Sequence, residues 1–357
     1  MTHKHHWYFY PSLVLLVLVL LAGGLLGYMT LTEYRPAPVE AAQQGGAAQT
    51  AAYDGGAFRI ASFNTGYASL GRDADFLMDG GRGSGMAERS TVEANMAGIE
   101  NVLQKAQADV YILQEVDRDC AGTDGINQLE AYGAALPRHH WAYGPNFVAK
   151  FVPYPITHPF GRMDSGVVTY SRFAMREAQR ISLPVPFAWP IRTANLKRCM
   201  LLTRVPIEGT ERELVVINFH LEAYDDGEGK TAQTAQLLEL LEEEYAKGNF
   251  VIAGGDFNQI FPEVKTDLKE TSEWVPGDLD PLPESMEGWR YVYDDSVPTC
   301  RLLNQPYAPD SPMTQYYVID GFIVSPNLEV EAVQTLDEDF RFSDHNPVVM
   351  DVRPVKN

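Results

Sequence analysis

The sequence contains little cysteine and few positive charges. Its 357 residues include only Cys120, Cys199 and Cys300, so at most one disulfide can form within the chain, and their spacing does not match a zinc site. Lysine and arginine total 28 against 48 aspartates and glutamates, which gives a formal net charge of −20. No basic run provides a stripe for nucleic-acid phosphates, and this charge disfavours long-range attraction to nucleic acid or anionic lipid. The low cysteine content therefore excludes a framework of several disulfides.

Charged residues are absent from residues 7–32, and residues 12–26 are almost wholly Leu, Val, Ala and Gly. A run of this length can span a bilayer. The four aromatic residues at positions 7–10 form a belt at one end, as is typical of a membrane interface. We therefore expect a short N-terminal segment over residues 1–10 and a transmembrane helix or signal anchor over residues 11–32.

The charges beside this apolar run predict its orientation. Lys4 precedes the run, whereas Glu33 and Arg35 follow it, so the positive-inside rule favours a single-pass protein of the cell membrane with the rest of the chain outside the cytoplasm. A cleaved signal peptide, and hence secretion, is the alternative. The run is longer than a usual signal-peptide core and no small-x-small site follows it closely, which favours the anchor.

Composition also divides the rest of the chain. Residues 33–53 are rich in Ala, Gln, Gly and Pro, which predicts a flexible linker. No second linker interrupts residues 54–357, so we expect one domain there, with residues 261–301, acidic and rich in proline, as an insertion. The sequence has no repeat or heptad pattern, and no protein partner can be inferred from it.

Two segments have apolar residues at helical spacing. Residues 90–93 read as a capping box that opens a helix through Ala106. A second helix is predicted over residues 231–247, with Gly248 ending it.

Polar residues lie where strand-like apolar runs meet loops. The residues concerned are Asn64, Glu115, His220, Asp256, Asn258, Asp320, Asp344 and His345. Gly-Gly-Asp and Ser-Asp-His-Asn-Pro are also ordinary turn compositions. So many acidic, amide and imidazole groups at strand ends, in a chain with 8 histidines, favour one converging site.

These residues belong to motifs that resemble a known family. In order, the motifs are Ser62-Phe63-Asn64, Leu113-Gln114-Glu115-Val116, Asp164-Ser165-Gly166 with Tyr170-Ser171-Arg172, Asn218-Phe219-His220-Leu221, Gly255-Asp256-Phe257-Asn258, Ile319-Asp320 and Ser343-Asp344-His345. From about residue 58 to 352 the chain resembles the endonuclease/exonuclease/phosphatase superfamily, which includes deoxyribonuclease I, abasic-site endonucleases, neutral sphingomyelinases and inositol-polyphosphate phosphatases. With its apolar N-terminal segment it resembles a membrane-anchored, bacterial-type member. The resemblance implies an α+β fold, a four-layer αββα sandwich with the site at one end.

The resemblance also implies metal ligands. Glu115 would be the principal ligand of Mg²⁺, with Mn²⁺ as the alternative ion, since hard cations prefer carboxylate oxygens. Asn64 would support this ligand and Asp344 would share the metal.

Catalytic roles follow from the same resemblance. Asp256 would orient or deprotonate the attacking water, and Asn258 would donate to a phosphoryl oxygen. His345 would be a general acid/base or a phosphate-stabilising group, oriented by Asp320. His220 occupies the position of a second catalytic histidine in the deoxyribonuclease and sphingomyelinase branches, which weakens the abasic-repair interpretation.

Three further residues are candidates for substrate binding. Arg162 or Asp164 would partner His220 or a phosphate oxygen, or would form a salt bridge between loops. Arg192 lies with Lys197 and Arg198 in the densest basic patch, which would be either a phosphate-guiding loop or a solvated strand entry.

The expected function is metal-dependent hydrolysis of a phosphodiester by in-line attack of water, with nucleic acid or phospholipid as the substrate. Two aromatic loops, residues 146–160 and 183–190, would stack bases, enter a lipid interface, or simply pack over the sheet ends. The alternatives are a phosphomonoesterase acting on a sugar or inositol phosphate, and an inactive binding module on the same fold.

Overall fold

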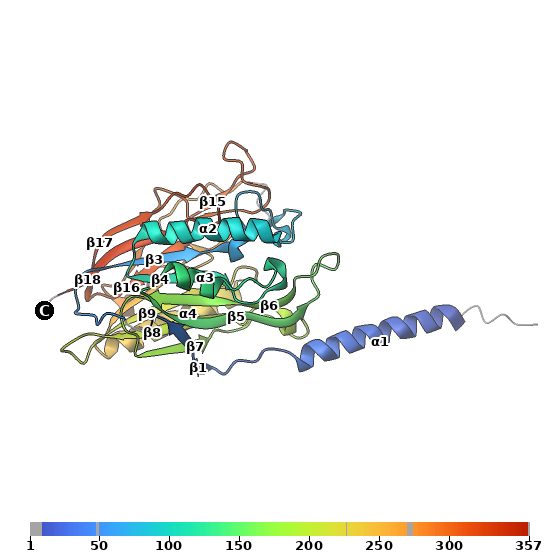
Figure 1. Cartoon of the computed structure of the whole chain (residues 1–357), viewed down its shortest axis with the longest axis horizontal. Coiled ribbons are helices and arrows are strands. Elements are labelled where there is room, and N and C mark those ends of the chain that lie inside the picture. The colour runs from blue at the N-terminus through green and yellow to red at the C-terminus, as the bar shows by residue number, and fades with distance from the viewer. Residues whose placement is uncertain (1–8, 48–49, 226, 270–273, 356–357) are drawn as a thin grey trace, which may run out of the picture.

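Two seven-stranded sheets face each other in the computed structural model, which describes residues 9–47, 50–225, 227–269 and 274–355 (Figure 1). The first sheet has the order β1 (Val39–Ala41), β7 (Glu177–Ser182), β8 (Cys199–Pro206), β9 (Glu213–His220), β10 (Phe250–Asp256), β16 (Asp320–Val324) and β13 (Arg290–Val292). The second has the order β17 (Leu328–Thr335), β18 (Val348–Pro354), β3 (Phe58–Asn64), β4 (Val110–Asp117), β6 (Gly161–Ser171), β5 (His140–Val152) and β2 (Gln43–Gly46). Only the pairs β9–β10 and β3–β4 are parallel within these two sheets as described.

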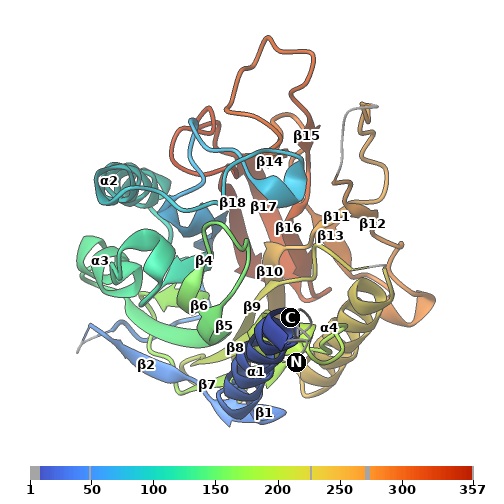
Figure 2. The ribbon, with the colours of Figure 1, turned by 90° about the vertical axis from the view of Figure 1, so that its right-hand side faces the viewer.

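Helices cover the outer faces of both sheets, as Figure 2 shows. α2 (Arg89–Ala106) and α3 (Gln128–Ala135) pack on the second sheet, and α4 (Glu228–Ala246) packs on the first. Two small ribbons, β11 (Gln259–Ile260) with β12 (Gly277–Asp278) and β14 (Cys300–Arg301) with β15 (Tyr316–Tyr317), lie outside the main sheets. The layers are helix, sheet, sheet, helix, which confirms the predicted αββα sandwich.

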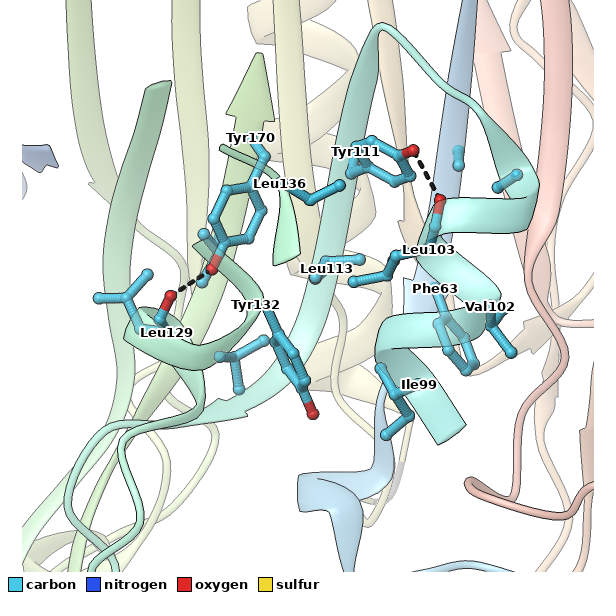
Figure 3. Packing of buried hydrophobic residues seen from close by; sticks show 14 of the residues in the cluster. Phe63, Ile99, Val102, Leu103, Tyr111, Leu113, Leu129, Tyr132, Leu136 and Tyr170 are labelled. Carbon is cyan, nitrogen blue, oxygen red and sulfur yellow. Dashed lines mark hydrogen bonds between the residues drawn. The ribbon is translucent and has the colours of Figure 1, made fainter. Parts of the chain in front are cut away.

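Alternation along β3 places its apolar residues in two different hydrophobic clusters. On β3, Phe58 and Ile60 pack between the sheets, whereas Ala61 and Phe63 pack against the helices. Figure 3 shows this second cluster, in which the hydroxyl of Tyr170 donates to the carbonyl of Leu129 at 2.7 Å. Period-two patterning of apolar residues therefore fixes which face of each strand meets which layer.

Both predicted helices form, but each begins earlier than the sequence suggested. The amides of Thr91 and Val92 donate to the carbonyl of Glu88, so α2 begins at Arg89 with Glu88 as its N-cap. The predicted capping box is therefore wrong, because Ser90 already lies inside the first turn. α4 begins at Glu228, and Gly248 follows its end with a φ of +87°.

The predicted flexible linker is partly paired with the sheets. β1 pairs with β7 and β2 pairs with β5, so residues 39–46 supply an edge strand to each sheet. Gly45 lies against the ring of Trp141, where an added Cβ would come within 2.5 Å of a ring carbon. Such pairing is compatible with the composition of the predicted linker, because edge pairing uses backbone groups, which small and polar residues provide as well as others.

Removing these edge strands is expected to lower stability. A fragment that begins at Ala52 loses both pairings, whereas one that begins at Glu33 keeps them. At a net of about 1 kcal/mol per hydrogen bond, we expect a loss of about 2–4 kcal/mol, seen as a melting temperature about 5–10 °C lower. Equal melting temperatures for the two fragments would show that the pairing contributes nothing.

A buried carboxylate on α4 predicts a pH-dependent part of the stability. Arg204 donates two bonds of 2.7 Å to Glu244, and Lys247 donates a third at 2.7 Å. Burial alone would raise the pKa of Glu244, but these cations lower it from 4.5 to about 2. The stabilisation is therefore present above pH 4.5 and is lost as the pH falls through about 2.

Glu244→Gln is expected to lower the free energy of unfolding at pH 7 by about 3 kcal/mol. The difference between the variant and the wild type should shrink by about half by pH 3, because the wild-type carboxylate is then mostly protonated in the unfolded state but still mostly ionised in the folded state. Urea unfolding at both pH values measures this difference. A difference that stays constant with pH would contradict the ion-pair explanation.

Candidate active site

Neighbouring strands of the first sheet bring three predicted site residues into one row. In the register of the sheet, Asp256 at the end of β10 pairs with His220 at the end of β9 and with Asp320 on β16. Asp320 begins its strand, although the strand-like run Tyr316-Tyr317-Val318-Ile319 before it would predict a strand that ends there; in that run Tyr316 and Tyr317 form the short strand β15. The row lies at one end of the sandwich.

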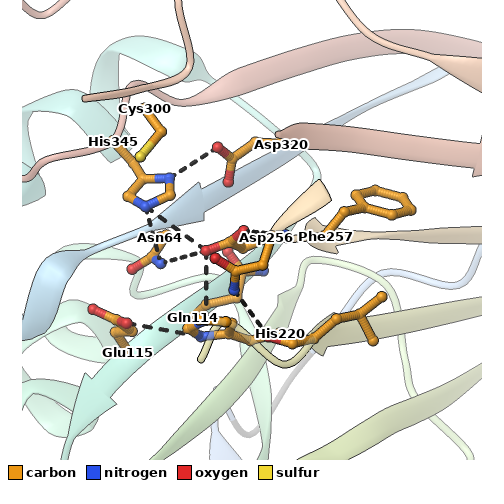
Figure 4. Close-up of polar contacts among 12 residues, drawn as sticks. Asn64, Gln114, Glu115, His220, Asp256, Phe257, Cys300, Asp320 and His345 are labelled. Atoms are coloured by element: carbon orange, nitrogen blue, oxygen red, sulfur yellow. Dashed lines mark hydrogen bonds and ion pairs between the residues drawn. The ribbon is translucent and has the colours of Figure 1, made fainter. Parts of the chain in front are cut away.

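The second sheet brings Asn64, Glu115 and His345 to this row (Figure 4), with Asp344 beside His345, whereas Asn258 follows β10 of the first sheet. Asn64 ends β3 and pairs in register with Gln114 on β4, beside Glu115. Asp344 and His345 precede β18. Below them, the Gln114 side chain donates to Asn218 Oδ1 at 2.8 Å, which ties the two sheets together at the base of the site. The eight residues predicted to converge therefore do converge.

The glycines before Asp256 lie in a strand and not in the turn that the composition Gly-Gly-Asp would also allow. Gly254 and Gly255 both belong to β10. A Cβ on Gly254 would come within 2.8 Å of Phe322 and Ile112, because the two sheets approach each other closely there. Gly255 has a φ of +150°, which other residues rarely adopt. Both glycines therefore set the position of Asp256.

Asp256 lies at the centre of the site and is buried. Asn64 Nδ2 donates to its Oδ2 at 3.0 Å, and His220 Nε2 and His345 Nε2 lie 3.5 and 3.7 Å from the same oxygen. The amide of Asn258 donates to Oδ1 at 2.9 Å. One carboxylate is thus held between two imidazoles, each at a distance longer than a direct hydrogen bond.

The two imidazoles differ in protonation. Burial lowers the pKa of His345, but Asp320, 2.8 Å from Nδ1 to Oδ2, together with Cys300 and Asp256 outweighs burial and raises this pKa well above its ordinary value. Burial, Arg198 and His345 lower the pKa of His220 well below its ordinary value. A charged and a neutral imidazole therefore flank Asp256, so the site offers both a donor and an acceptor.

Glu115 has an unusual backbone. The register of β4 with β6 shifts between Leu113 and Val116, which is a β-bulge, and Glu115 has a φ of +56°. Such strain in a non-glycine residue is typical of functional sites, where a bulge redirects a side chain. The side chain lines the cavity described below.

The chemistry around Glu115 fits a divalent cation. Its Oε2 is buried with no hydrogen-bond partner among the described residues. Burial and the negative charge of Asp344 raise the pKa of Glu115 well above its ordinary value. A buried carboxylate, Asp344, beside a partly exposed one, Glu115, whose Oε2 has no partner, offers the ligands that Mg²⁺ prefers, and a cation would remove their repulsion.

Asp256, Asp320 and His345 form a second arrangement. Among the residues that the structure describes, these three can bring one ligand atom each within 4.8 Å of one another. The short contact between Asp320 and His345 already uses one ligand atom of each. We therefore regard Glu115 with Asp344 as the better cation site.

The three predicted substrate-binding residues lie outside this centre. Arg162 contacts Asp119 at 2.5 Å, Asp164 contacts Arg118 at 2.6 Å, and Arg192 contacts Glu33 at 3.3 Å. None of the three lines the cavity. Neither Arg162 nor Asp164 partners His220, so that prediction is wrong and the alternative, a salt bridge, is what the structure contains.

Arg198 was assigned to a solvated or phosphate-guiding patch, and the structure corrects this. It is buried, it donates to Glu222 Oε2 at 3.1 Å and to the carbonyl of His220 at 3.2 Å, and it lines the cavity. No sequence signal separated it from Arg192 and Lys197, since its partner Glu222 is 24 residues away. Arg198 supplies the positive charge closest to His220.

Arg198 and the site residues around Asp256 line a cavity of about 720 Å³. Both predicted aromatic loops contribute to its walls, as do residues from near the N-terminus and from the predicted insertion. The apolar side chains include Phe147, Tyr154, Phe160, Phe187 and Trp274. The cavity therefore has polar site residues at its base and aromatic side chains along its walls.

The matching family is now clear. Residues 89–345, more than half of the chain, match the model of the Endonuclease/Exonuclease/phosphatase family. The chain belongs to this family. Members of this superfamily are in general metal-dependent hydrolases of phosphoester bonds, and the convergence of acidic, amide and imidazole groups agrees with membership. No curated protein matches the sequence.

Solved structures share the fold of this family member at low sequence identity. The endonuclease/exonuclease/phosphatase from Beutenbergia cavernae DSM 12333 is 20% identical with a TM-score of 0.58, over 84% of this chain and 72% of that one. TDP2 from C. elegans is 15% identical with a TM-score of 0.52, over 83% and 75%. The human Nocturnin catalytic domain is 16% identical with a TM-score of 0.50, over 88% and 97%. At these identities the likeness concerns the fold.

Proposed function

We propose that the protein is a Mg²⁺-dependent phosphodiesterase that uses in-line attack by water. The observation that carries this proposal is Asp256, held between His220 and His345 in the same cavity as the carboxylates Glu115 and Asp344. Glu115 and Asp344, supported by Asn64, would hold the ion. When bound, it would polarise a phosphoryl oxygen and neutralise developing charge.

The protein residues would supply the proton transfers. Asp256 would orient a water and take its proton as the water oxygen bonds to phosphorus. As the bond from phosphorus to the leaving oxygen breaks, that oxygen must receive a proton, and charged His345 is suited to donate it or to stabilise the phosphoryl oxygens. Asp320 would hold His345 in this state through their contact of 2.8 Å.

Two neutral groups would complete the site. Asn258 uses one side-chain N–H to donate to the carbonyl of Leu221 at 2.9 Å, which leaves its second N–H for a phosphoryl oxygen. His220 would remain neutral beside Asp256 and accept a hydrogen bond from water or substrate. The negative charge that develops on the phosphate would thus meet donors already in place.

α1 (Phe9–Leu31) supports a membrane location. It is 23 residues long, with a mean hydropathy of 2.4 over its most apolar window, and is long and apolar enough to cross a membrane. Trp7, Tyr8 and Lys4, on which the aromatic belt and the orientation rest, lie outside the described residues. We place the protein in the cell membrane with its catalytic domain outside the cytoplasm; secretion after cleavage is the alternative.

Hydrolysis by the full chain in detergent tests this proposal. Duplex DNA, a choline phospholipid and a small phosphomonoester are offered in parallel, with Mg²⁺ or with a chelator. We expect a diester to be cleaved only with the metal, and His345→Ala to remove the activity. Cleavage of the monoester alone would replace the diesterase assignment with a phosphomonoesterase. If a folded protein that binds Mg²⁺ hydrolysed none of the three substrates, the remaining interpretation would be an inactive binding module.

A further inference from the structure

The last turns of α1 form part of the active-site wall. Leu25, Leu26 and Met29 line the same cavity as Glu115 and the two catalytic histidines. Met29 is buried, with 8% of its surface exposed. Farther toward the N-terminus the helix leaves the domain, and Figure 1 shows it projecting away from the sandwich. An apolar helix that could span a bilayer thus contributes side chains to the wall of the catalytic cavity.

Polar contacts hold this end of the helix against the domain. Trp189 Nε1 donates to Thr30 Oγ1 at 3.0 Å. Glu33, just after the helix, is buried and lies within 3.4 Å of Arg35, Arg192 and Lys197. Arg192 and Lys197 belong to the segment that leads to Arg198 in the site. These contacts therefore attach the C-terminal end of α1 to the segment that contains Arg198, a charged residue of the site.

The length of α1 places the cavity mouth at a membrane surface. The helix runs from Phe9 to Leu31, and the part before the cavity-lining side chains, residues 9–24, rises about 24 Å, most of the roughly 30 Å hydrocarbon core of a bilayer. The cavity wall formed by Leu25, Leu26 and Met29 therefore lies near the membrane surface. Two adjoining loops carry large apolar side chains that are exposed, namely Tyr154, Ile156, Trp189 and Ile191. Aromatic and aliphatic side chains of this kind are typical of surfaces that contact the lipid interface.

The charge distribution of the protein disfavours nucleic acid as the substrate. The chain has a formal net charge of −20, and Arg162 and Arg192, the arginines predicted to bind substrate, are neutralised by Asp119 and Glu33. A nucleic acid needs many exposed cations along its backbone. A single headgroup phosphate needs only the local site.

From these observations, and given the proposed function, we infer that the substrate is the headgroup phosphodiester of a membrane lipid, taken directly from the leaflet around the C-terminal end of α1. The scissile phosphate lies at Asp256, and the acyl chains leave past Leu25, Leu26 and Met29 toward the bilayer. The helix is thus a substrate-positioning element as well as an anchor.

Reconstituted full-length protein tests this inference. Its substrates are vesicles of phosphatidylcholine, alone or mixed with phosphatidylglycerol, and a soluble aryl phosphodiester. The variant Leu25→Ala/Leu26→Ala/Met29→Ala removes the apolar wall. Its matched control, Leu18→Ala/Leu20→Ala/Leu21→Ala, changes exposed positions of the same helix outside the cavity. The measured quantity is the ratio of lipid to soluble-diester hydrolysis, and the released headgroup identifies which lipid is used.

We expect the ratio to fall about tenfold or more in the cavity variant, because several methylene contacts to the lipid chains are lost, and to stay at the wild-type value in the control. An equal ratio in both variants overturns the inference. So does a wild type that cleaves the soluble diester or duplex DNA but neither vesicle, and in that case the proposed function stands. A wild type that cleaves none of these substrates with Mg²⁺ removes the proposed function itself.

Discussion

Asp256→Asn is expected to lower kcat/KM by about 10³-fold, within the range for loss of a general base. Asparagine has nearly the same size and can keep the amide contact to Asn258, but it cannot accept a proton from water. Since the loss concerns the transition state, we expect kcat to fall and KM to change little. Steady-state hydrolysis of a soluble diester by the full chain measures both parameters.

Asp351→Asn is the matched control for this substitution. Asp351 lies on β18 in an ion pair with Arg59, 2.7 Å long and half-exposed, and it does not line the active-site cavity. The control should keep its activity, because surface ion pairs contribute little to stability. If Asp256→Asn kept more than about a tenth of the wild-type rate while correctly folded, Asp256 would not act on the attacking water.

His345→Gln is expected to lower kcat by about 10²–10³-fold, since it removes a charged donor from the site. Asp320→Asn should cost less, about tenfold, because His345 remains and only its orientation and charge are affected. The pH profile separates the two roles. Without the charge of Asp320, burial dominates and the pKa of His345 falls, so the alkaline limb of the rate should move to lower pH.

The pH at which the rate declines on the alkaline side distinguishes the role of His345 from that of Asp320. Wild-type activity should persist through neutral pH and decline as the pH rises through the raised pKa of His345. Asp320→Asn should decline at a lower pH. A profile for Asp320→Asn with the same limb as wild type, at a uniformly reduced rate, would mean that Asp320 supports structure only.

Much of the fold could be predicted because its signals are local. Alternating apolar residues along β3 and β18 and helical spacing along α2 and α4 specify which face is buried, and the structure places them accordingly. The predicted capping box was wrong because the backbone amides of Thr91 and Val92 donate to the carbonyl of Glu88, which makes Glu88, and not Ser90, the N-cap of α2.

The features that could not be predicted depend on partners distant in the sequence. β1 and β2 form through backbone pairing with β7 and β5, which leaves no side-chain pattern. Asp320 begins β16 because β10 pairs with it, although more than sixty residues separate them in the sequence. The burial of Arg198 and of Glu33 likewise follows from where their partners fold.

The site was predictable in its residue types but not in its geometry. Motifs named Asn64, Glu115, His220, Asp256, Asn258, Asp320, Asp344 and His345. The bulge that gives Glu115 a φ of +56° and the entry of Met29 into the cavity have no counterpart in the motifs. The former supports a cation site and the latter bears on substrate choice, so both come from the structure.

The most direct test of the central claim is a titration of Mg²⁺ into the metal-free full chain, with the heat of binding and the hydrolysis of a soluble diester followed on the same samples. We predict one saturating site whose midpoint coincides with the rise in activity, and loss of both in Glu115→Gln. Hydrolysis that proceeds fully in the presence of a chelator, or binding and activity that survive unchanged in Glu115→Gln, would contradict a metal-dependent site built on Glu115.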